Sequence, residues 1–295
     1  MTSTSSQSDQ SAAEAPEVSV ILPCYNSHRF LQQTIDSLRA QTFRDFEIIL
    51  VNDGSTDPDT ISFIASLADD VQVIEQHNMG LSAARNTGIR AARGTLILPL
   101  DCDDWLDPTT LQKMRDRLHE LPESAFVYTH MRMTGDLTGT LEKDYNYFEQ
   151  LFFNQLPYCL MLRRVIWQQI GGYDESMRRG YEDWEYNIRL GRHDHFGVAI
   201  NEPLFNYRIA ETGMLKSISQ RLHGHLWRSI QKKNPDAYRI SELIKAWRRW
   251  RHTPSTYPLA LYFGWLLMHR ILPAAMFRSL FNALLPYRQS ARVAD

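Results

Sequence analysis

The sequence has 295 residues, which suffices for one large domain or for a domain with an appendage. Hydrophobic residues make up 43% and charged residues 22%, so a largely disordered chain is excluded. The net charge of -2 gives no reason to expect a nucleic-acid partner, but the charge is distributed unevenly. Residues 216–295 contain 14 Lys and Arg against 3 Asp and Glu, which suggests a separate role for this basic part.

The cysteine content and the N-terminal composition bear on the cellular setting. Cys24, Cys102 and Cys159 are far apart and no CxxC pair occurs, so neither a zinc site nor a disulfide framework is indicated. Buried free thiols in a reducing cytosol are therefore expected. Residues 1–16 are rich in Ser, Gln and Ala and lack the apolar core of a signal peptide, which predicts a disordered leader.

The N-terminal third of the chain alternates between short apolar runs and segments with helical spacing. Strands are expected at the apolar runs, which cover residues 18–22, 46–51, 71–75 and 95–100. Helices are expected after the capping candidates Asn26 and Ser27, from Pro58 to about Leu67, and over residues 80–93. Strands separated by helices of about ten to fifteen residues predict a parallel sheet with helices on both faces. In such sheets, ligands bind beyond the carboxyl ends of the strands, where Tyr25, Asp53 and Asp101–Asp104 all fall.

The fourth apolar run ends abruptly in Asp101, Asp103 and Asp104. Three carboxylates at the end of a buried strand repel one another, and a hard divalent cation such as Mg2+, Mn2+ or Ca2+ relieves the repulsion. The other interpretation is a solvated acidic turn before a helix, with Asp107 as the N-cap and Pro108 in the first turn. This stretch alone leaves both interpretations open.

The middle of the chain gives weaker signals. A helix is expected over residues 111–118, a strand over 126–130, a turn at 171–174 and a helix opening at 181–185. Residues 134–158 are polar and aromatic with little periodicity, which predicts loops that shape a pocket. Residues 159–170 are apolar at helix-like spacing.

Five segments match one family pattern, in family order and at family-like spacing. They are VSVILPCYN (18–26), QTFRDFEIILVNDGSTD (41–57), NMGLSAARNTGIRAARGTLILPLDCDD (78–104), GGYDES (171–176) and GYEDWE (180–185). Over about residues 17–210 the chain thus resembles the family 2 glycosyltransferases, which have the GT-A fold. The resemblance implies an α/β, Rossmann-like, mostly parallel sheet sandwiched by helices. It implies a catalytic domain over residues 17–215, followed by a basic, partly amphipathic helical extension over residues 216–295.

The resemblance also implies a reaction. Family members transfer a sugar from a nucleotide diphosphate to a hydroxyl with inversion at the anomeric carbon, and they use a divalent metal, here expected to be Mn2+ or Mg2+. We therefore expect a nucleotide-diphosphate sugar as the donor, with UDP favoured over GDP or dTDP. The expected acceptor is a glycan or a lipid-linked glycan in polysaccharide or cell-surface glycan biosynthesis. A non-catalytic sugar-nucleotide or glycan-binding protein on the same scaffold is the alternative.

Motifs that are missing narrow this expectation. Neither GxGxxG nor GxxxxGK[ST] occurs, which argues against a dinucleotide fold and a P-loop ATPase. The QxxRW motif of processive synthases is also missing, because Arg248-Arg249-Trp250 lacks a Gln at the required spacing. We therefore expect addition of one or a few sugars rather than processive polymerisation.

The resemblance assigns donor-binding positions residue by residue. Asp53 stands where the family hydrogen-bonds the nucleotide base, and a carboxylate can accept from a base N–H. Its alternative is an ordinary turn residue before Gly54. Tyr25 is expected against the base, or else in the core, and Arg85 is expected to help hold the nucleotide, or else to be a solvated helix residue. The full donor-binding set is Pro23, Tyr25, Asp53, Arg85, Asp101 and Cys102.

The two acidic motifs carry the expected chemistry. Asp101-Cys102-Asp103 matches the DxD signature: Asp103 is expected to contact the metal directly, and Asp101 to lie near the ribose or the metal's water shell. Glu182-Asp183 matches the family's ED motif. Asp183 is expected to take the proton of the acceptor hydroxyl, with Glu182 as the second candidate or as an orienting residue. The alternative is a pair of acids stabilised by the dipole of a first helical turn.

Roles are also expected for two further residues. Trp184 is expected either to form a stacking wall for an acceptor sugar or to belong to the core. Arg208, in the Tyr207-Arg208 pair that resembles the end of the family's catalytic domain, is expected to approach the diphosphate.

The basic C-terminal part combines aromatic, basic and apolar residues. The apolar run over residues 257–268 is shorter than the roughly 20 residues that cross a bilayer. Residues 247–285 are therefore expected to lie in a membrane interface and to be attracted to anionic lipid, which would place a cytoplasmic protein at the inner membrane face. The alternative is a helical hairpin that covers the catalytic domain or forms a dimer contact. No nucleic-acid module is recognisable.

Overall fold

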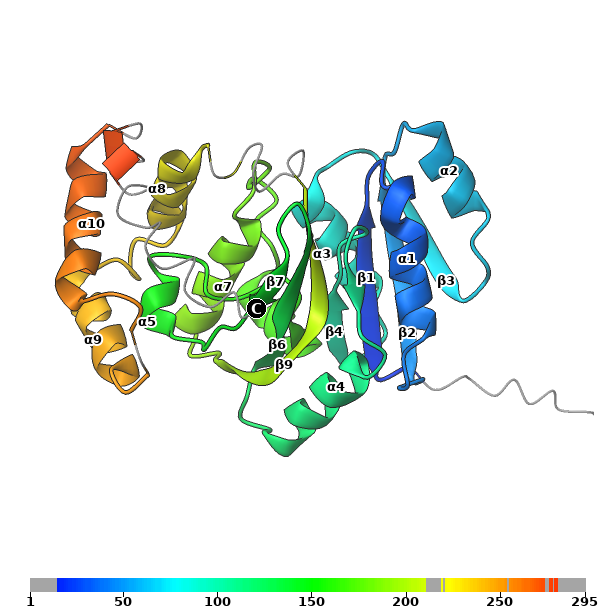
Figure 1. The fold of residues 1–295 in the computed structure, drawn as a ribbon, viewed down its shortest axis with the longest axis horizontal. Coiled ribbons are helices and arrows are strands. Elements are labelled where there is room, and N and C mark those ends of the chain that lie inside the picture. The colour runs from blue at the N-terminus through cyan, green and yellow to red at the C-terminus, as the bar shows by residue number, and fades with distance from the viewer. Residues whose placement is uncertain are drawn as a thin grey trace, which may run out of the picture.

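The computed structural model describes residues 15–210, 219, 221–253, 255–273, 276–277 and 279–280. The expected leader over residues 1–16 therefore lies outside the described residues, apart from its last two positions. The described elements form one mixed sheet covered by helices (Figure 1).

The described residues form a nine-stranded sheet with the strand order β3-β2-β1-β4-β8-β6-β9-β5 and with β7 paired to β6. Its parallel half consists of β1 (Val18–Cys24), β2 (Phe46–Asp53), β3 (Val71–Gln76) and β4 (Leu96–Pro99). The other strands are β5 (Trp105–Leu106), β6 (Phe126–Gly135), β7 (Gly139–Leu141), β8 (Met161–Arg163) and β9 (Gly197–Ile209). Strand β8 is antiparallel to both β4 and β6 and joins the two halves. Because β1 is parallel to β2 and to β4, the carboxyl ends of these three strands lie at one edge.

The parallel strands separate two hydrophobic cores, because successive side chains of a strand point to opposite faces. Val20 and Leu22 belong to the core under α1 (His28–Arg39) and α2 (Pro58–Ala65). Ile21 belongs to the core under α3 (Leu81–Ala91). A Cβ on Gly88 of α3 would lie 2.5 Å from Ile21 Cγ2, so the glycine allows this helix to approach the sheet closely.

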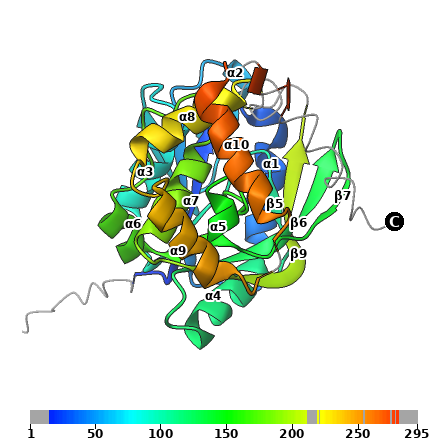
Figure 2. The same ribbon diagram turned by 90° about the vertical axis from the view of Figure 1, so that its left-hand side faces the viewer.

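The remaining helices are α4 (Thr110–Glu120), α5 (Tyr147–Gln150), α6 (Arg164–Ile170), α7 (Glu182–Arg192), α8 (His223–Lys233), α9 (Ile240–Trp250) and α10 (Leu259–Ile271). Helices α8, α9 and α10 lie at the end of the molecule opposite β3 (Figure 1), and α9 and α10 face outward there (Figure 2). They share a hydrophobic core with α5 and α7. The Tyr262 ring, for example, lies 5.1 Å from that of Phe148 and 5.0 Å from that of Phe152. No helix in the described part of the chain combines the length and the apolar character needed to cross a bilayer.

A buried carboxylate ties α10 and the residues before it to α5. Glu149 is 2% exposed and accepts hydrogen bonds from Thr256 N at 2.5 Å, Thr256 Oγ1 at 2.9 Å and Gln155 Nε2 at 3.1 Å. The Tyr262 hydroxyl donates to it as well. A buried charge is tolerated where several donors surround it, so Glu149 fixes the C-terminal helices on the body of the protein.

The structure corrects several sequence predictions. The segment 134–158 consists mostly of loops, as predicted, but the end of β6, the short strand β7 and the short helix α5 interrupt them. The segment 159–170 is not one helix: β8 pairs with two strands before α6 begins. Strand β9 has no counterpart among the predicted elements. Helix α4 begins at Thr110 rather than after an Asp107 cap, and the Asp107 carboxylate instead accepts from Arg132 and Asn206.

The start of α1 also differs from the prediction. Ser27 occupies the N-cap position but makes no side-chain capping bond. Asn26 Oδ1 accepts from the backbone N–H groups of Thr56 and Asp57, at 2.8 and 2.9 Å. Asn26 therefore joins the loops that follow β1 and β2 instead of capping its own helix.

Replacing Glu149 tests the attachment of the C-terminal helices. We expect Glu149→Ala to lower the free energy of unfolding by about 2–4 kcal/mol, because Tyr262 and Thr256 lose a charged acceptor inside the protein. Chemical denaturation measures this, with the exposed Glu142→Ala as the matched control. A loss equal to that of the control would show that Glu149 does not hold these helices.

Candidate functional site

The candidate site is organised around a buried arginine. Arg85 of α3 is 1% exposed, and its Nη2 donates to the two carboxylate oxygens of Asp101 at 2.7 and 3.0 Å. Its Nη1 donates to Glu182 Oε1 at 2.9 Å. The guanidinium also lies over the rings of Tyr158 and Tyr173, at 4.9 and 5.5 Å from their centroids. Arg85 thereby holds the residues after β4 against the start of α7, and it is not the solvated helix residue of the alternative interpretation.

The turn after β4 is fixed by a fully buried carboxylate. Asp104 Oδ2 accepts from the Tyr158 hydroxyl at 2.5 Å, and Oδ1 accepts from the backbone N–H of Arg208 in β9 at 2.7 Å. Burial, and then the neighbouring charge of Asp103, raises the pKa of Asp104 well above its usual range. The Tyr158 oxygen accepts from the backbone N–H of Asp101 at 3.0 Å. Asp104 therefore shapes the turn from which its neighbours project.

Asp103 differs from the other carboxylates of this turn because its side chain is exposed. Loss of solvent at the turn and the charge of Asp101 raise the pKa of Asp103 to about 6. Arg208 Nε donates to the backbone oxygen of Asp103, at 3.0 Å, rather than to its carboxylate. An exposed carboxylate beside a second one is a suitable oxygen donor for Mg2+ or Mn2+, so the residues present fit a divalent metal.

The second acidic motif opens α7. Glu182 is buried against Arg85, and burial raises the pKa of Glu182 to about 7 although the Arg85 charge acts in the opposite direction. Asp183 is partly exposed: Oδ1 accepts from Trp184 N at 2.8 Å, and Oδ2 accepts from Asn154 Nδ2 at 2.7 Å. Burial also raises the pKa of Asp183, while Arg85 and these two bonds act to lower it. Within the described residues, Glu182 forms an ion pair and Asp183 forms none.

Asp53 makes more contacts than the sequence suggested. It is 3% exposed, and Oδ1 accepts from Gln76 Nε2 at 2.6 Å and Met79 N at 2.8 Å. Oδ2 accepts from Gly80 N at 2.8 Å. Asp53 thus holds the loop that leads into α3, which carries Arg85, and Oδ2 retains a lone pair for a further donor.

The other expected donor-binding residues lie after β1 and β4. Tyr25 is 49% exposed, so it is not a core aromatic and its ring is available to a planar ligand. Pro23 and Cys102 are buried, and Cys102 Sγ donates to the Pro23 backbone oxygen at 3.2 Å. Their contact joins the end of β1 to the turn that carries Asp101 and Asp103.

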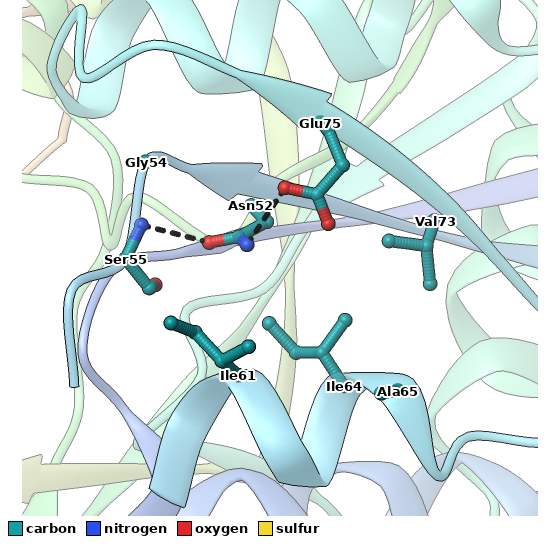
Figure 3. A pocket seen from close by; sticks show the side chains of 8 residues that line it. All are labelled: Asn52, Gly54, Ser55, Ile61, Ile64, Ala65, Val73 and Glu75. Atoms are coloured by element: carbon teal, nitrogen blue, oxygen red, sulfur yellow. Dashed lines mark hydrogen bonds between the residues drawn. The ribbon is translucent and has the colours of Figure 1, made fainter. Parts of the chain in front are cut away.

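A hollow of about 440 Å³ lies between α2 and β3 (Figure 3). It is separate from the candidate site around Arg85. Asn52 and Glu75 line it, and Asn52 Nδ2 donates to Glu75 Oε2 at 2.8 Å. Because side chains alternate along a strand, Asn52 and Glu75 face α2 whereas their neighbours Asp53 and Gln76 face the other side of the sheet. The sheet thus separates this hollow from Asp53.

The structure also shows where the predictions for residues outside the two acidic motifs succeed or fail. Trp184 is 2% exposed and its Nε1 donates to Gln150 O at 2.6 Å, so the sugar-stacking interpretation is wrong and the core interpretation is confirmed. Arg208 lies beside Asp103, with its guanidinium 4.0 Å from the centroid of the Phe30 ring. Sequence reasoning missed Tyr158 and Asn154, because they stand in a segment without periodicity and no local pattern marks them.

A second group of residues that could bind a metal ion lies outside the candidate site. His28, Asp57 and Asp59 have ligand atoms within 4.8 Å of one another. Asp57 already caps α2 and lies 2.7 Å from His28 Nδ1, which accounts for its position without a metal.

Comparisons with known proteins agree on one family. Residues 19–179 match the family model described as Glycosyl transferase family 2. A Bacillus subtilis (strain 168) protein named as a glycosyltransferase, EpsH, is 30% identical over 240 residues, which cover 73% of this chain and 66% of that protein. Chondroitin synthase of Escherichia coli is 33% identical over 183 residues, which cover 59% of this chain and 26% of the synthase. The chain thus spans less than two thirds of the length of these relatives.

A solved structure matches the fold. TarS 1–349 of S. aureus in complex with UDP-GlcNAc has a TM-score of 0.59 and 19% sequence identity, covering 72% of this chain and 65% of that chain. The predicted GT-A architecture, with a mostly parallel sheet, covering helices and C-terminal helices, is thereby confirmed.

Removing the buried arginine tests the organisation of the site. We expect Arg85→Ala to lower the free energy of unfolding by about 3–5 kcal/mol, because Asp101 and Glu182 lose their shared cation. The matched control is Arg90→Ala, which removes an exposed arginine from the same helix. Denaturant titration of both variants measures the effect, and similar losses for both would contradict the central role of Arg85.

Proposed function

Because the chain belongs to glycosyl transferase family 2, we propose that it is an inverting, metal-dependent glycosyltransferase. It moves a sugar from a nucleotide-diphosphate sugar to a hydroxyl of a glycan or lipid-linked glycan. The observation that carries the proposal is the bridge from Asp101 through Arg85 to Glu182, which brings the residues after β4 and the start of α7 together. An exposed Asp103 then lies in the first segment, and Asp183, which has no ion pair with any described residue, lies in the second.

The two acids have different roles in this proposal. Asp103, with Asp101 beside it, would hold Mn2+ or Mg2+, which supplies charge neutralisation for the diphosphate as it leaves. Asp183 takes the proton of the acceptor hydroxyl while that oxygen attacks the anomeric carbon from the side opposite the diphosphate. Glu182 remains bonded to Arg85 and keeps α7 in place, which favours Asp183 as the base.

UDP is the nucleotide that we propose for the donor. A structural neighbour of this chain is described in complex with UDP-GlcNAc, which supports a UDP-sugar. The exposed Tyr25 ring offers a stacking surface for the base, and Asp53 Oδ2 offers an acceptor for a base N–H. The related chondroitin synthase supports a polysaccharide or cell-surface glycan as the wider context.

We also propose that α9 and α10 rest on an anionic membrane surface, on the cytoplasmic side. Half of the exposed large hydrophobic side chains of the described residues lie between residues 240 and 280. On α9, Ile240 and Ile244 are exposed at a spacing of one helical turn, and Arg248 continues the same face. On α10, Leu267 and Ile271 are exposed beside Arg270. Apolar side chains flanked by arginines suit the interface of an anionic bilayer.

A donor screen tests the catalytic proposal. We expect one sugar nucleotide, most simply a UDP-sugar, to raise the melting temperature in the presence of Mn2+, and EDTA to abolish the shift. Asp103→Ala should lose this stabilisation, whereas Asp183→Asn should keep it and lower kcat by about two to four orders of magnitude, because only the base is removed. Thermal shift and nucleotide release are the readouts.

The exposed Asp59→Ala serves as the control for Asp103→Ala and should behave as the wild type. If no UDP-, GDP- or dTDP-sugar stabilises the protein with any metal, the proposed donor site is wrong. If a sugar nucleotide stabilises the protein but no sugar is transferred to any acceptor, the alternative of a non-catalytic sugar-nucleotide-binding protein would be supported instead.

Vesicle binding tests the membrane proposal. We expect the protein to sediment with vesicles that contain phosphatidylglycerol, less so at high salt, and not with pure phosphatidylcholine. Ile244→Ser combined with Leu267→Ser should weaken this binding by about tenfold or more, because two apolar side chains no longer enter the interface. Ile61→Ser, an exposed position on α2, is the control. Equal binding by all variants, or none by the wild type, would contradict the proposal.

A further inference from the structure

Asn154 lies in the segment after α5 and contacts the proposed base. Its Nδ2 donates to Asp183 Oδ2 at 2.7 Å. The segment is held in place at this residue, because Lys143 Nζ donates to the Asn154 backbone oxygen at 2.7 Å. Asn154 can donate a hydrogen bond to Asp183 only if the nitrogen of its amide, rather than the oxygen, faces the carboxylate. The two amide atoms are distinguished by their hydrogen-bond partners.

The neighbouring groups determine this orientation. The backbone N–H of Gln155 can only donate, and it donates to Gln150 Oε1 at 2.7 Å. Gln150 therefore presents its Nε2 to Asn154 Oδ1, at 2.9 Å. Asn187 Nδ2 donates to the same oxygen at 3.3 Å. With its oxygen engaged by two donors, Asn154 has to direct its nitrogen toward Asp183.

The orientation has a chemical consequence for Asp183. Each carboxylate oxygen accepts one fixed N–H, from Trp184 on Oδ1 and from Asn154 on Oδ2. Donated hydrogen bonds favour the charged form of a carboxylate, and neither of these donors can itself take up a proton. The remaining lone pairs stay available to an incoming hydroxyl.

We propose that Asn154 is a positioning residue for the base: it orients the Asp183 carboxylate toward the acceptor hydroxyl. The inference rests on the proposed function, in which Asp183 is the base. Asn154 does not touch the reacting atoms; it acts through Asp183, and Gln150 and Asn187 act through Asn154.

Several ionisable groups act on the Asp183 charge from the elements packed around it. They are Arg85, Asp101, Lys143, Tyr173, Tyr181, Glu182 and Tyr207. Burial lowers the pKa of Lys143 to about 8, so its positive charge near Asp183 is lost on the alkaline side of neutrality. The acid limb of a pH profile includes Glu182, whose pKa is about 7, as well as Asp183, and the alkaline limb includes Lys143. The Asn154 contact is therefore measured as the shift of the acid limb between the wild type and the Asn154 variants.

The test compares two variants. Asn154→Asp keeps the shape of the side chain but replaces the N–H donor with a carboxylate oxygen, and Asn154→Ser removes the amide without adding charge. Both should raise the pKa of Asp183, because the ionised carboxylate loses a donor, and the acid limb of kcat should move to higher pH by about one unit or more. At neutral pH, kcat should fall by about tenfold to a hundredfold. The KM for the sugar nucleotide should stay within about twofold, because binding of the sugar nucleotide does not use Asn154. The exposed Asn201→Asp is the matched control and should leave both parameters unchanged.

A second readout does not depend on turnover. Carboxyl-carbon NMR titration follows the ionisation of Asp183 directly, and Asp183→Asn assigns its signal. An unchanged Asp183 titration in both Asn154 variants would overturn the inference, even if activity falls. A shifted titration in a protein that transfers no sugar from any donor would sustain the contact and refute the proposed function instead.

Discussion

The arrangement of the site depends on one buried charge. Arg85 is almost completely removed from water, and an arginine in such surroundings requires anionic partners. It finds them in Asp101 and Glu182, which are far apart in the sequence and belong to different halves of the fold. The rings of Tyr158 and Tyr173 cover the same guanidinium. The relative position of the two acidic motifs is thus fixed by the need to neutralise Arg85.

This constraint divides the acidic residues by role. Asp53, Asp104 and Glu182 are buried, and each is engaged by donors that hold a loop or a helix start. Asp103 and Asp183 keep part of their surface in solvent. The acidic residues, which look alike in the sequence, therefore fall into two groups. The buried ones hold the structure together, and the smaller, partly exposed group remains available for chemistry. The same burial that fixes the supporting acids raises the pKa of Asp104 and Glu182.

The sequence predicted the parallel half of the fold well, because β1, β2, β3 and β4 are short apolar runs whose identity is local. It also predicted that Asp53, Asp101 and Asp103 gather at one edge, since this follows from parallel pairing. It failed where the decisive contacts are distant: β8 is a strand only because it pairs with β4 and β6, and the Asp107 carboxylate is engaged by Asn206 of β9. Asn154 could not be found from the sequence, since its significance comes from the orientation that Gln150 and Asn187 impose.

In the proposed function, the segments joined by Arg85 form one site, with the sugar-nucleotide donor and its metal at the first segment and the base at the second. The most direct measurement is the crystal structure of the protein with Mn2+ and a non-hydrolysable UDP-sugar, using the anomalous signal of manganese to locate the ion. We expect one strong peak beside the Asp103 carboxylate, with the Asp183 carboxylate facing the anomeric carbon from the side opposite the diphosphate. Manganese at the exposed group of His28, Asp57 and Asp59, or a sugar that does not face Asp183, would contradict it.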